Sequence, residues 1–378
     1  MGDLAPVMPR RHGGIFLSAT KPSPVSSIFG SATLLPVFLL HPGVVMSARL
    51  SLAACVRTIV LLTTIALPSL SQAWDATGHR LAAYVAYQTL TAPQRDYWLD
   101  VLQQHPRYAP DFADAMPQAI RAASREEQSR WLLGQAAVWP DLARGLPDAI
   151  RSRYNQPDWH WIDGAWVRDD AQTQGNVYLD TAPQPDIQGA PANNSQHASH
   201  ASNVVTALER AHWQLAHETD AAQRAIALCW LLHLIGDIHQ PLHTGGLVSS
   251  QLFPNGDRGG NAIRTRGSNL HAVWDQALRG PALNNSLMAL NALATSVPRT
   301  QAFTPTQWLH ESRSILLQNV YPDSIIENVR LSENTGSRLD SVTLRHHYEA
   351  DMKQTAAIRL AEAGVRISNT LANISGTP

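Results

Sequence analysis

Residues 221–243 read AAQRAIALCWLLHLIGDIHQPLH. The segment Ala221–Asp237 is strongly apolar and contains no proline, and this pattern predicts a long helix. Cys229 lies inside its most apolar part, LCWLL, so we expect an inert buried thiol and not a reactive nucleophile.

The end of this stretch carries side chains that can bind a metal ion. His233 and Asp237 are four residues apart, so on a helix they share one face and can reach the same ion. Pro241 ends the helix, which allows His243 to point toward another centre. A buried His–Asp hydrogen bond is the alternative, but the third histidine and the proline at this spacing favour a metal site.

Helical patterns continue along the chain from Trp74 onward. Long stretches lack glycine and proline and place apolar residues at helical spacing, whereas strand-like alternation is scarce. With no internal repeat and no long linker, we predict an all-α protein with a single mainly helical domain. Thr181–Ser202 is expected to be a surface loop. Further helices are expected at Arg80–Leu90, Gln94–Gln104, Ser124–Val138, Val204–Leu215, Leu270–Leu278 and Ala350–Leu371.

The composition excludes several classes of protein. The 378 residues are 44% hydrophobic and 16% charged, which excludes a disordered, collagen-like or coiled-coil chain. With 29 basic and 30 acidic side chains, the chain also lacks the polybasic surface of proteins that bind nucleic acid by electrostatics alone. Binding of phosphate through a metal ion stays open.

The first part of the chain has the pattern of an export signal. Residues 46–73 have a basic start, an apolar run over Thr58–Leu67 and the small-residue end Ser71-Gln72-Ala73, which predicts a signal peptide cleaved after Ala73. A transmembrane anchor is the alternative, but it needs about 20 apolar residues. We expect an exported protein, periplasmic or secreted.

Residues 1–45 are an uncertain leader, which either reflects a start assigned too early or is an extended export sequence. Residues 1–73 contain five of the basic and one of the acidic side chains, so residues 74–378 carry a formal charge near −5. Cleavage would remove Cys55 and leave Cys229 without a partner for an intrachain disulfide.

A second His–Asp pair follows the first. His271 and Asp275 are again four residues apart at helical spacing. Between the two pairs, residues 257–261 read DRGGN, and Gly259 and Gly260 allow backbone conformations and close approaches that other residues do not. The loop is an ordinary turn by itself, and its nearness to His271 associates it with the second site.

Three motifs upstream combine aromatic residues with metal-binding groups. Asp141 follows Trp139-Pro140, and His160 and Asp163 lie in the run Trp159-His160-Trp161-Ile162-Asp163. Aromatic rings can exclude water around a metal or stack on a base; an aromatic core with polar groups at its rim is the equal alternative. At the predicted cleavage point, a new amino group on Trp74 could bind zinc together with His79; otherwise Trp74 is a buried hydrophobic terminus.

The ordered set W-x4-H, W-x-D, W-H-W-I-D, H-x3-D-x-H-Q-P-L-H, D-R-G-G-N and N-L-H-x2-W-D resembles the secreted single-strand-specific nucleases with three zinc ions, the S1/P1 family. The resemblance extends from Trp74 to about Asp275, with a weaker similarity in Ala361–Asn373. It implies a zinc-dependent nuclease domain over residues 74–378 with the helical fold that zinc-dependent phospholipase C shares. The ordered set is specific, whereas no single motif is.

The resemblance implies three Zn²⁺ sites. Asp237 would bridge the first two, and His239 would support the site or pack against it without binding zinc. The implied ligands are Asp141, His160, His233 and Asp237 for the first ion, Trp74 and His79 with Asp237 for the second, and His243, His271 and Asp275 for the third. All are nitrogen or oxygen donors, which suits zinc.

The resemblance also implies catalytic roles for Asp141 and Asp163, and substrate binding by Asp163 and by Trp161, which would stack on a base. Residues 74–378 contain one lysine, Lys353, so the basic partner of the scissile phosphate would be an arginine, for which Arg168 is our candidate. The expected reaction is hydrolysis of single-stranded DNA and RNA to 5′-phosphate products, with release of phosphate from 3′-nucleotides.

Two other functions compete with this one. Zinc-dependent phospholipase C is similar in fold, but there the histidine after the tryptophan lies further on and the last pair ends in Glu, whereas this chain has His79 and Asp275. A non-catalytic periplasmic zinc-binding protein would not need mixed carboxylate ligands and a base platform. We expect a monomer without stable membrane association.

Overall fold

A computed structural model of the chain describes residues 74–162, 201–280, 283–299 and 302–376. The expected leader and signal peptide, residues 1–73, lie outside the described residues, as does Thr181–Ser202 apart from its last two positions. The principal helices are α2 (Ala76–Thr89), α3 (Ala92–Gln103), α5 (Arg125–Ala143), α6 (Asp148–Tyr154), α8 (Val204–His217), α9 (Ala221–Ile238), α10 (Leu270–Asp275), α11 (Leu283–Ala294), α12 (Pro305–Ile315), α13 (Asp323–Thr335) and α14 (His346–Ser375).

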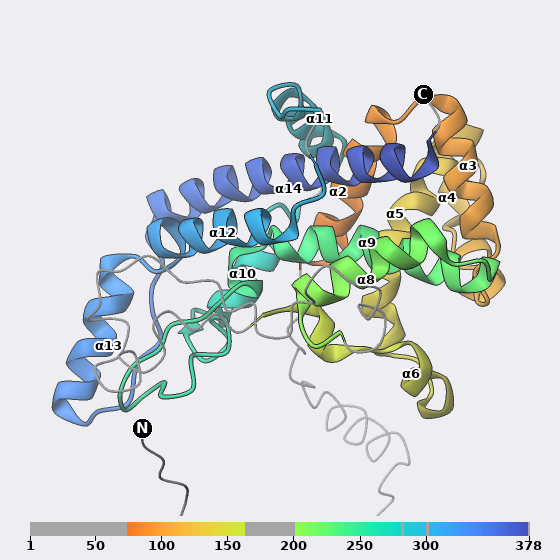
Figure 1. The fold of residues 1–378 in the computed structure, drawn as a ribbon. Coiled ribbons are helices and arrows are strands. Elements are labelled where there is room, and N and C mark those ends of the chain that lie inside the picture. Colours follow the sequence, from red (N-terminus) through yellow and green to blue (C-terminus); the bar gives the residue numbers. More distant parts are fainter. Residues whose placement is uncertain (1–73, 163–200, 281–282, 300–301, 377–378) are drawn as a thin grey trace, which may run out of the picture. The chain divides into compact units, whose positions relative to one another are not determined.

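The prediction of an all-α fold is confirmed (Figure 1). Within the described residues, strand structure is limited to β1 (Arg264–Thr265) and β2 (Ser268–Asn269), which form an antiparallel hairpin with Thr265 opposite Ser268. Shorter helical turns complete the chain at α4 (Gln118–Arg121), η1 (Ala109–Ala113), η2 (Pro157–His160), η5 (Pro241–His243) and η6 (Leu316–Val320).

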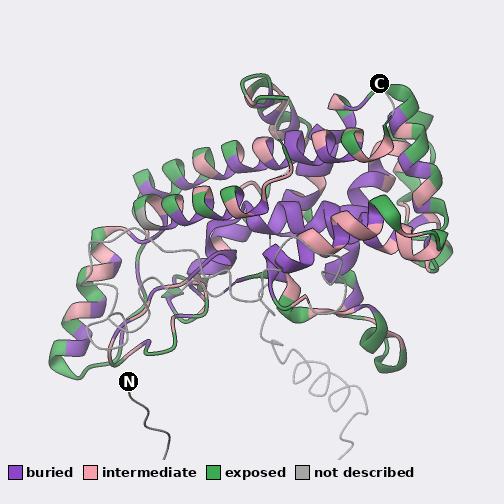
Figure 2. Cartoon of the chain, viewed as in Figure 1, coloured by how far each residue is buried: buried purple, intermediate pink, exposed green. Residues whose placement is uncertain are grey.

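Helix α9 forms the centre of the core. Every residue from 227 to 245 is buried, covering most of the helix and the turn that follows it (Figure 2). The helix packs against α5 and α8, while α2 packs against α5 and α14. By length and composition α9 could cross a membrane, but its burial among these helices identifies it as a core helix. Cys229 is free and buried there, and burial raises the pKa of its thiol well above the usual value.

The expected helices form with shifted ends. The largest shift concerns α5, which we expected to end at Val138 before Trp139-Pro140 and which continues to Ala143. Pro140 removes one backbone hydrogen bond and crowds the carbonyl of the preceding turn, yet the helix continues through it, and the adjacent Trp139 is fully buried in the core. Asp141 therefore lies on a helix and not in a loop.

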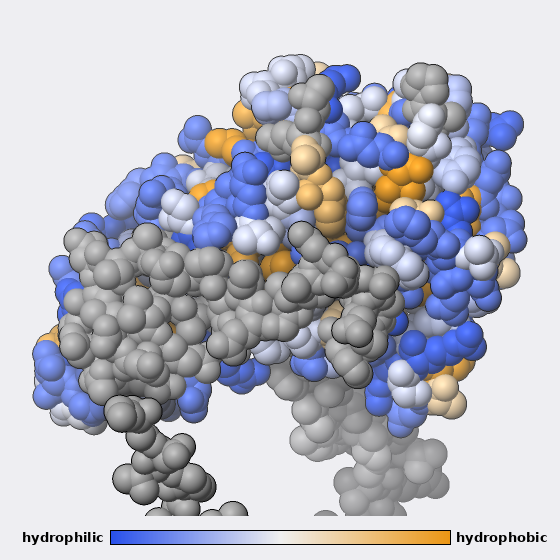
Figure 3. Space-filling view, viewed as in Figure 1, coloured by the Kyte–Doolittle hydropathy of each residue, from blue (hydrophilic) through white to orange (hydrophobic). Residues whose placement is uncertain are grey.

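The sequence patterns did not predict helices α6, α11, α12 and α13. Polar side chains interrupt their patterns, and α12 and α13 begin next to prolines. Buried Trp308 and Leu309 attach α12 to the core, so packing decides this segment more than intrinsic propensity does. The described surface in Figure 3 is largely hydrophilic with small separate apolar areas, so the apolar helix faces point mainly inward.

Candidate metal centres and substrate pocket

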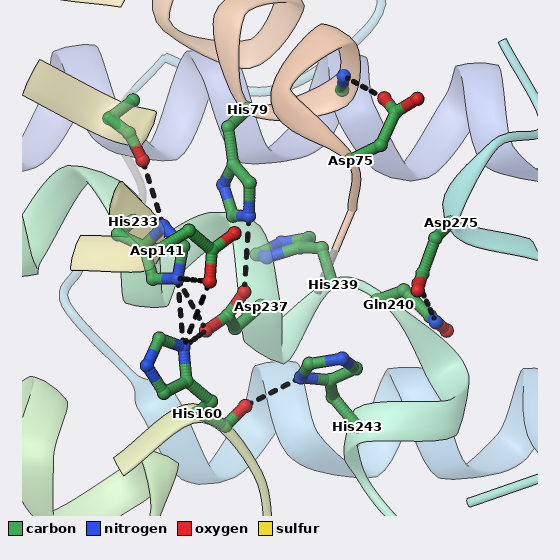
Figure 4. A network of polar contacts seen from close by, with 12 residues as sticks. Asp75, His79, Asp141, His160, His233, Asp237, His239, Gln240, His243 and Asp275 are labelled. Atoms are coloured by element: carbon green, nitrogen blue, oxygen red, sulfur yellow. Dashed lines mark hydrogen bonds and ion pairs between the residues drawn. The ribbon is translucent and has the colours of Figure 1, made fainter. Parts of the chain in front are cut away.

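The start of α2 holds His79 at the core. Asp75 caps the helix and accepts hydrogen bonds from the backbone N–H of Thr77 (2.9 Å) and Gly78 (3.1 Å). A Cβ at Gly78 would lie 2.7 Å from Cβ of Trp74, so glycine lets the buried indole pack against the first turn. This turn directs the imidazole of His79 toward α9 (Figure 4).

His79 is fully buried against α9. Its ring stacks on that of His233 with centroids 4.0 Å apart, and its Nε2 lies 3.4 Å from Oδ1 of Asp237. A Cβ at Gly236 would lie 2.7 Å from Nδ1 of His79. The absence of a side chain at position 236 therefore allows the imidazole to reach the carboxylate.

The first centre gathers His233, Asp237, His160 and Asp141. His233 donates from Nδ1 to the carbonyl of Ala137 (2.8 Å), which leaves its Nε2 facing Oδ2 of Asp237 at 3.2 Å. Nδ1 of His160 lies 3.0 Å from the same oxygen and 2.9 Å from Nε2 of His233. Oδ1 of Asp141 lies 3.8 Å from Nε2 of His233 (Figure 4).

Several buried atoms of this centre lack hydrogen-bond partners among the residues that the structure describes. They include Oδ2 of Asp141 and Nε2 of His160, and both ring nitrogens of the neighbouring His79 are in the same position. Burial of polar atoms without partners costs free energy unless a cation or water satisfies them. The donor set is imidazole nitrogen and carboxylate oxygen, which fits Zn²⁺.

Neighbouring imidazoles determine the protonation state of the Asp237 carboxylate. Burial alone would raise the pKa of Asp237, but the surrounding imidazoles of His233, His160 and His79 hold that pKa well below its usual value. The carboxylate is thus ionised in the core, which is the state that binds a metal.

The second centre contains His243 and His271. Their Nε2 atoms lie 3.1 Å apart, and Oδ2 of Asp275 lies 3.4 Å from Nε2 of His271. Nδ1 of His243 lies 2.6 Å from the carbonyl oxygen of His160, so this contact also connects the two centres. Burial raises the pKa of Asp275 well above its usual value, and a nearby cation would reverse that shift.

Gln240 positions Asp275 through a hydrogen bond that we did not predict from the sequence. Its Nε2 donates to Oδ1 of Asp275 (2.7 Å), and its Oε1 accepts from the backbone N–H of Leu242 (2.7 Å). Its position between His239 and Pro241, inside the H-Q-P-L-H motif, was the sequence feature that could have indicated a role at the site.

The DRGGN loop positions His271, as its nearness suggested. Asp257 is buried and accepts from the backbone N–H of Leu247 and the hydroxyl of Tyr321, each at 2.9 Å; burial raises its pKa to about 6. Gly259 has φ +58°, and a Cβ there would lie 2.4 Å from the carbonyl oxygen of Leu242. The carbonyl oxygen of Gly259 then lies 2.6 Å from Nδ1 of His271 and fixes the ring.

His239 faces away from both centres into a buried ion-pair cluster. Its Nε2 lies 2.6 Å from Nη1 of Arg366, which also pairs with Glu311 at 2.6 Å. Arg359 joins Glu311 and Glu362. His239, Glu311 and Glu362 are close enough to hold an ion, but two arginines already neutralise these carboxylates. The expected supporting role of His239 agrees with this placement.

A pocket of about 590 Å³ opens onto both centres. Trp161 lines it with 41% of its surface exposed, as a base platform requires. Arg144 also lines the pocket, and its Nη2 lies 3.0 Å from Oδ1 of Asp141. The sequence did not lead us to predict this ion pair, although Arg144 and Asp141 are one helical turn apart. The pocket is lined by Arg144, Arg151, Asn155, Pro157, His160, Trp161, Ile162, Leu242, His243, Gly245, Asn255, Arg258, Gly259, Asn261 and His271.

The structure brings eight of the nine expected ligand residues into groups that could each hold a metal ion. These groups are His79, His233 and Asp237; Asp141, His160 and His233; and His243, His271 and Asp275. Trp74, the ninth, is fully buried beside His79's helix. Asp163 and Arg168 lie outside the described residues.

Comparison with known proteins places this arrangement among nucleases. The chain is similar to Endonuclease 4 of Arabidopsis thaliana, with 34% identity over 158 residues, covering 39% of this chain and 50% of the relative. It is also similar to Endonuclease 3 of the same plant, with 31% identity over 159 residues, covering 39% and 51%. The chain thus spans about half the length of these curated relatives.

A family model extends the similarity over all the residues that the structure describes. The S1/P1 Nuclease model matches residues 74–376, which contain every side chain of the two centres and the pocket. The family is zinc-dependent, in agreement with the His and Asp groups. The chain belongs to the S1/P1 nuclease family.

Proposed function

We propose that this protein is a zinc-dependent hydrolase of phosphodiester bonds that cleaves single-stranded DNA and RNA to 5′-phosphate products and releases phosphate from 3′-nucleotides. Membership of the S1/P1 family supports hydrolysis of phosphodiester bonds. The observation that carries the proposal is one pocket lined by His160 of the first centre, His243 and His271 of the second, and exposed Trp161.

We assign three zinc ions to these centres. The first ion would be held by Asp141, His160, His233 and Asp237. The second ion would be held by His79, Asp237 and the amino group and carbonyl oxygen of Trp74. The third ion would lie at the second centre and be held by His243, His271 and Asp275. Bound zinc supplies Lewis-acid chemistry and lowers the pKa of a bound water. Buried atoms of Asp141, His160 and His79 without partners among the described residues support the first two ions.

The protein's own side chains would orient the substrate. Trp161 offers an exposed aromatic face on which an unpaired base can stack. Arg144 offers a guanidinium beside Asp141, suited to hydrogen bonds with the oxygens of the scissile phosphate. Arg168 and Asp163 keep their proposed contacts with phosphate and base.

A stacked base explains the preference for single strands. A base must leave the double helix before it can lie on Trp161, and that step costs a few kcal/mol in a duplex. The proposal therefore names single strands as substrates. Bound zinc would supply the affinity for phosphate that the formal charge near −5 of residues 74–378 does not.

The proposal includes removal of the signal peptide from the chain. We assign residues 1–45 to a leader, 46–73 to a signal peptide and 74–378 to the nuclease domain, which acts as a monomer outside the cytoplasm. Cleavage after Ala73 would convert the peptide nitrogen of Trp74 into an amine, which can lose its proton and bind zinc.

The test uses protein that begins at Trp74. Purified enzyme is incubated with single-stranded DNA, duplex DNA, RNA, a 3′-mononucleotide and phosphatidylcholine, each with zinc and with chelator. We expect cleavage of single strands, release of phosphate from the mononucleotide, and loss of both with chelator. Hydrolysis of phosphatidylcholine without cleavage of nucleic acid would overturn the proposal in favour of a phospholipase C.

A further inference from the structure

Three arginines surround the substrate pocket. Arg144, Arg151 and Arg258 line it, and its described lining includes no acidic side chain. Arg144 pairs with Asp141 at 3.0 Å, and Arg151 pairs with Asp148 at 2.5 Å. Two of the three arginines in the lining are therefore paired with aspartates.

Arg258 differs from the other two arginines in its partners. It is exposed and makes no ion pair within the part of the chain that the structure describes. In Figure 1 helix α6, which carries Arg151, and the segment leading into α10, which carries Arg258, both lie below α9. The pocket therefore receives cationic side chains from two separate segments of the chain.

The backbone of Arg258 is strained. Its φ is +60°, and it is the non-glycine residue with positive φ among the described residues. This conformation is unfavourable for a residue with a side chain, so surrounding contacts must maintain it. The carbonyl of Arg258 accepts from the side-chain amide of Asn261 (2.8 Å), and the adjacent Asp257 anchors the loop to Tyr321.

The same loop directs both a candidate ligand and this cation at the pocket. Gly259, next to Arg258, holds the ring of His271 through its carbonyl oxygen at 2.6 Å. Position 258 is therefore fixed relative to the second centre. A residue with no side chain would satisfy φ +60° without strain, yet an arginine stands there and lines the pocket.

We infer that Arg258 binds a phosphate of the substrate other than the scissile one, and that it makes the enzyme favour oligonucleotides over mononucleotides. This inference rests on the proposed nuclease function. A 3′-mononucleotide has a single phosphate, which would lie at the candidate metal centres. An oligonucleotide adds further phosphates along the strand, and a guanidinium can bind one of them with two parallel hydrogen bonds.

The test compares two substrates in wild-type protein and in Arg258→Gly, which removes the guanidinium and fits the positive φ. We expect kcat/KM for a single-stranded oligonucleotide to fall about tenfold relative to kcat/KM for a 3′-mononucleotide. The slope of log affinity against log salt should become shallower by roughly 1. Arg258→Lys, which keeps the charge, should retain the salt slope and lose part of the affinity.

Arg338→Gln is the matched control, because Arg338 is exposed and lies outside the pocket lining. It should behave as wild type with both substrates. If Arg258→Gly lowers hydrolysis of both substrates equally, Arg258 supports the loop and His271, and the inference is wrong. Unchanged selectivity and salt slope would also overturn it.

Direct binding separates this inference from the proposed function. Anisotropy with a labelled phosphorothioate oligonucleotide measures affinity for zinc-loaded protein without turnover. Weaker binding by Arg258→Gly, even in a protein that cleaves nothing, supports the phosphate site and refutes only the nuclease assignment. Equal binding by wild type and Arg258→Gly refutes the phosphate site whatever the activity.

Discussion

The Nε2 atoms of His243 and His271 lie 3.1 Å apart, and the Nδ1 atom of each ring lies 2.6 Å from a backbone carbonyl oxygen. A carbonyl only accepts, so both Nδ1 atoms carry the hydrogen. Burial lowers the pKa of His243, and in the neutral rings both Nε2 atoms present lone pairs to each other. Two lone pairs at this distance repel unless a cation lies between them. The arrangement therefore favours a bound metal.

Removal of one ring should remove one ion. His271→Ala is expected to lower the zinc content by about one ion per chain and to reduce kcat/KM at least about 100-fold, because metal affinity depends on each ligand and on its supporting contacts. Metal analysis and a cleavage assay check this. His347→Ala, at an exposed position, is the control, and full zinc content in His271→Ala would contradict the assignment.

Gly236→Ala tests the packing of His79 on α9. An alanine inside a helix is favoured by roughly 1 kcal/mol over glycine, so propensity alone predicts a more stable protein. The added Cβ would lie 2.7 Å from Nδ1 of His79 and must displace the ring. We expect at least tenfold weaker zinc binding in a chelator competition. Gly280→Ala, whose Cβ meets nothing within 4 Å, should bind zinc as wild type does, and equal affinity in both variants would refute the steric argument.

The amino group of Trp74 can be tested by adding residues before it. A protein with two extra residues at its N-terminus replaces the amine with a peptide nitrogen, which does not bind zinc. We expect it to bind less zinc and to lose most of its activity relative to protein that begins at Trp74. N-terminal sequencing verifies both forms, and full activity of the extended form would exclude the amine as a ligand.

His105 gives the protein a pH-dependent stability. Burial lowers its pKa from 6.5 to about 4, against the opposing charge of Asp111. Because the folded pKa is depressed below the unfolded value, this stabilising contribution is complete above pH 6.5 and is lost as the pH falls toward 4. The loss is on the order of 3 kcal/mol between pH 7 and pH 4.

Urea unfolding of wild type and His105→Asn at pH 7, 5.5 and 4 measures this effect. The wild type should lose more stability than the variant, whose side-chain oxygen can still accept from the backbone N–H of Arg107, as Nδ1 of His105 does at 3.1 Å. Asp257, with a pKa raised to about 6, acts in the opposite direction, since its contribution is lost as the pH rises through that value. It is present in both proteins and cancels in their difference, so parallel curves would contradict the role of His105.

Local spacing made much of the site predictable. His233 and Asp237, like His271 and Asp275, meet because a helix brings residues four apart onto one face. Pro241 also acts as expected, because α9 ends at Ile238 and His243 turns toward His271. These relations depend on a few neighbouring residues.

Contacts between distant segments were not predictable in the same way. The ion pair of Arg366 with Glu311 joins α14 to α12, and nothing in either helix indicates its partner. Gln240 and Arg144 were missed for a related reason, since their roles depend on which side chain lies opposite them in three dimensions. The continuation of α5 through Pro140 likewise depends on tertiary packing.

Zinc content measured together with activity tests the central claim most directly. Protein that begins at Trp74 is titrated with chelator, and zinc per chain and cleavage of single-stranded DNA are measured in the same samples. We predict three zinc ions per chain at the start, with cleavage declining as zinc is removed and returning when zinc is restored. Cleavage that persists after zinc has fallen below one ion per chain would contradict the account.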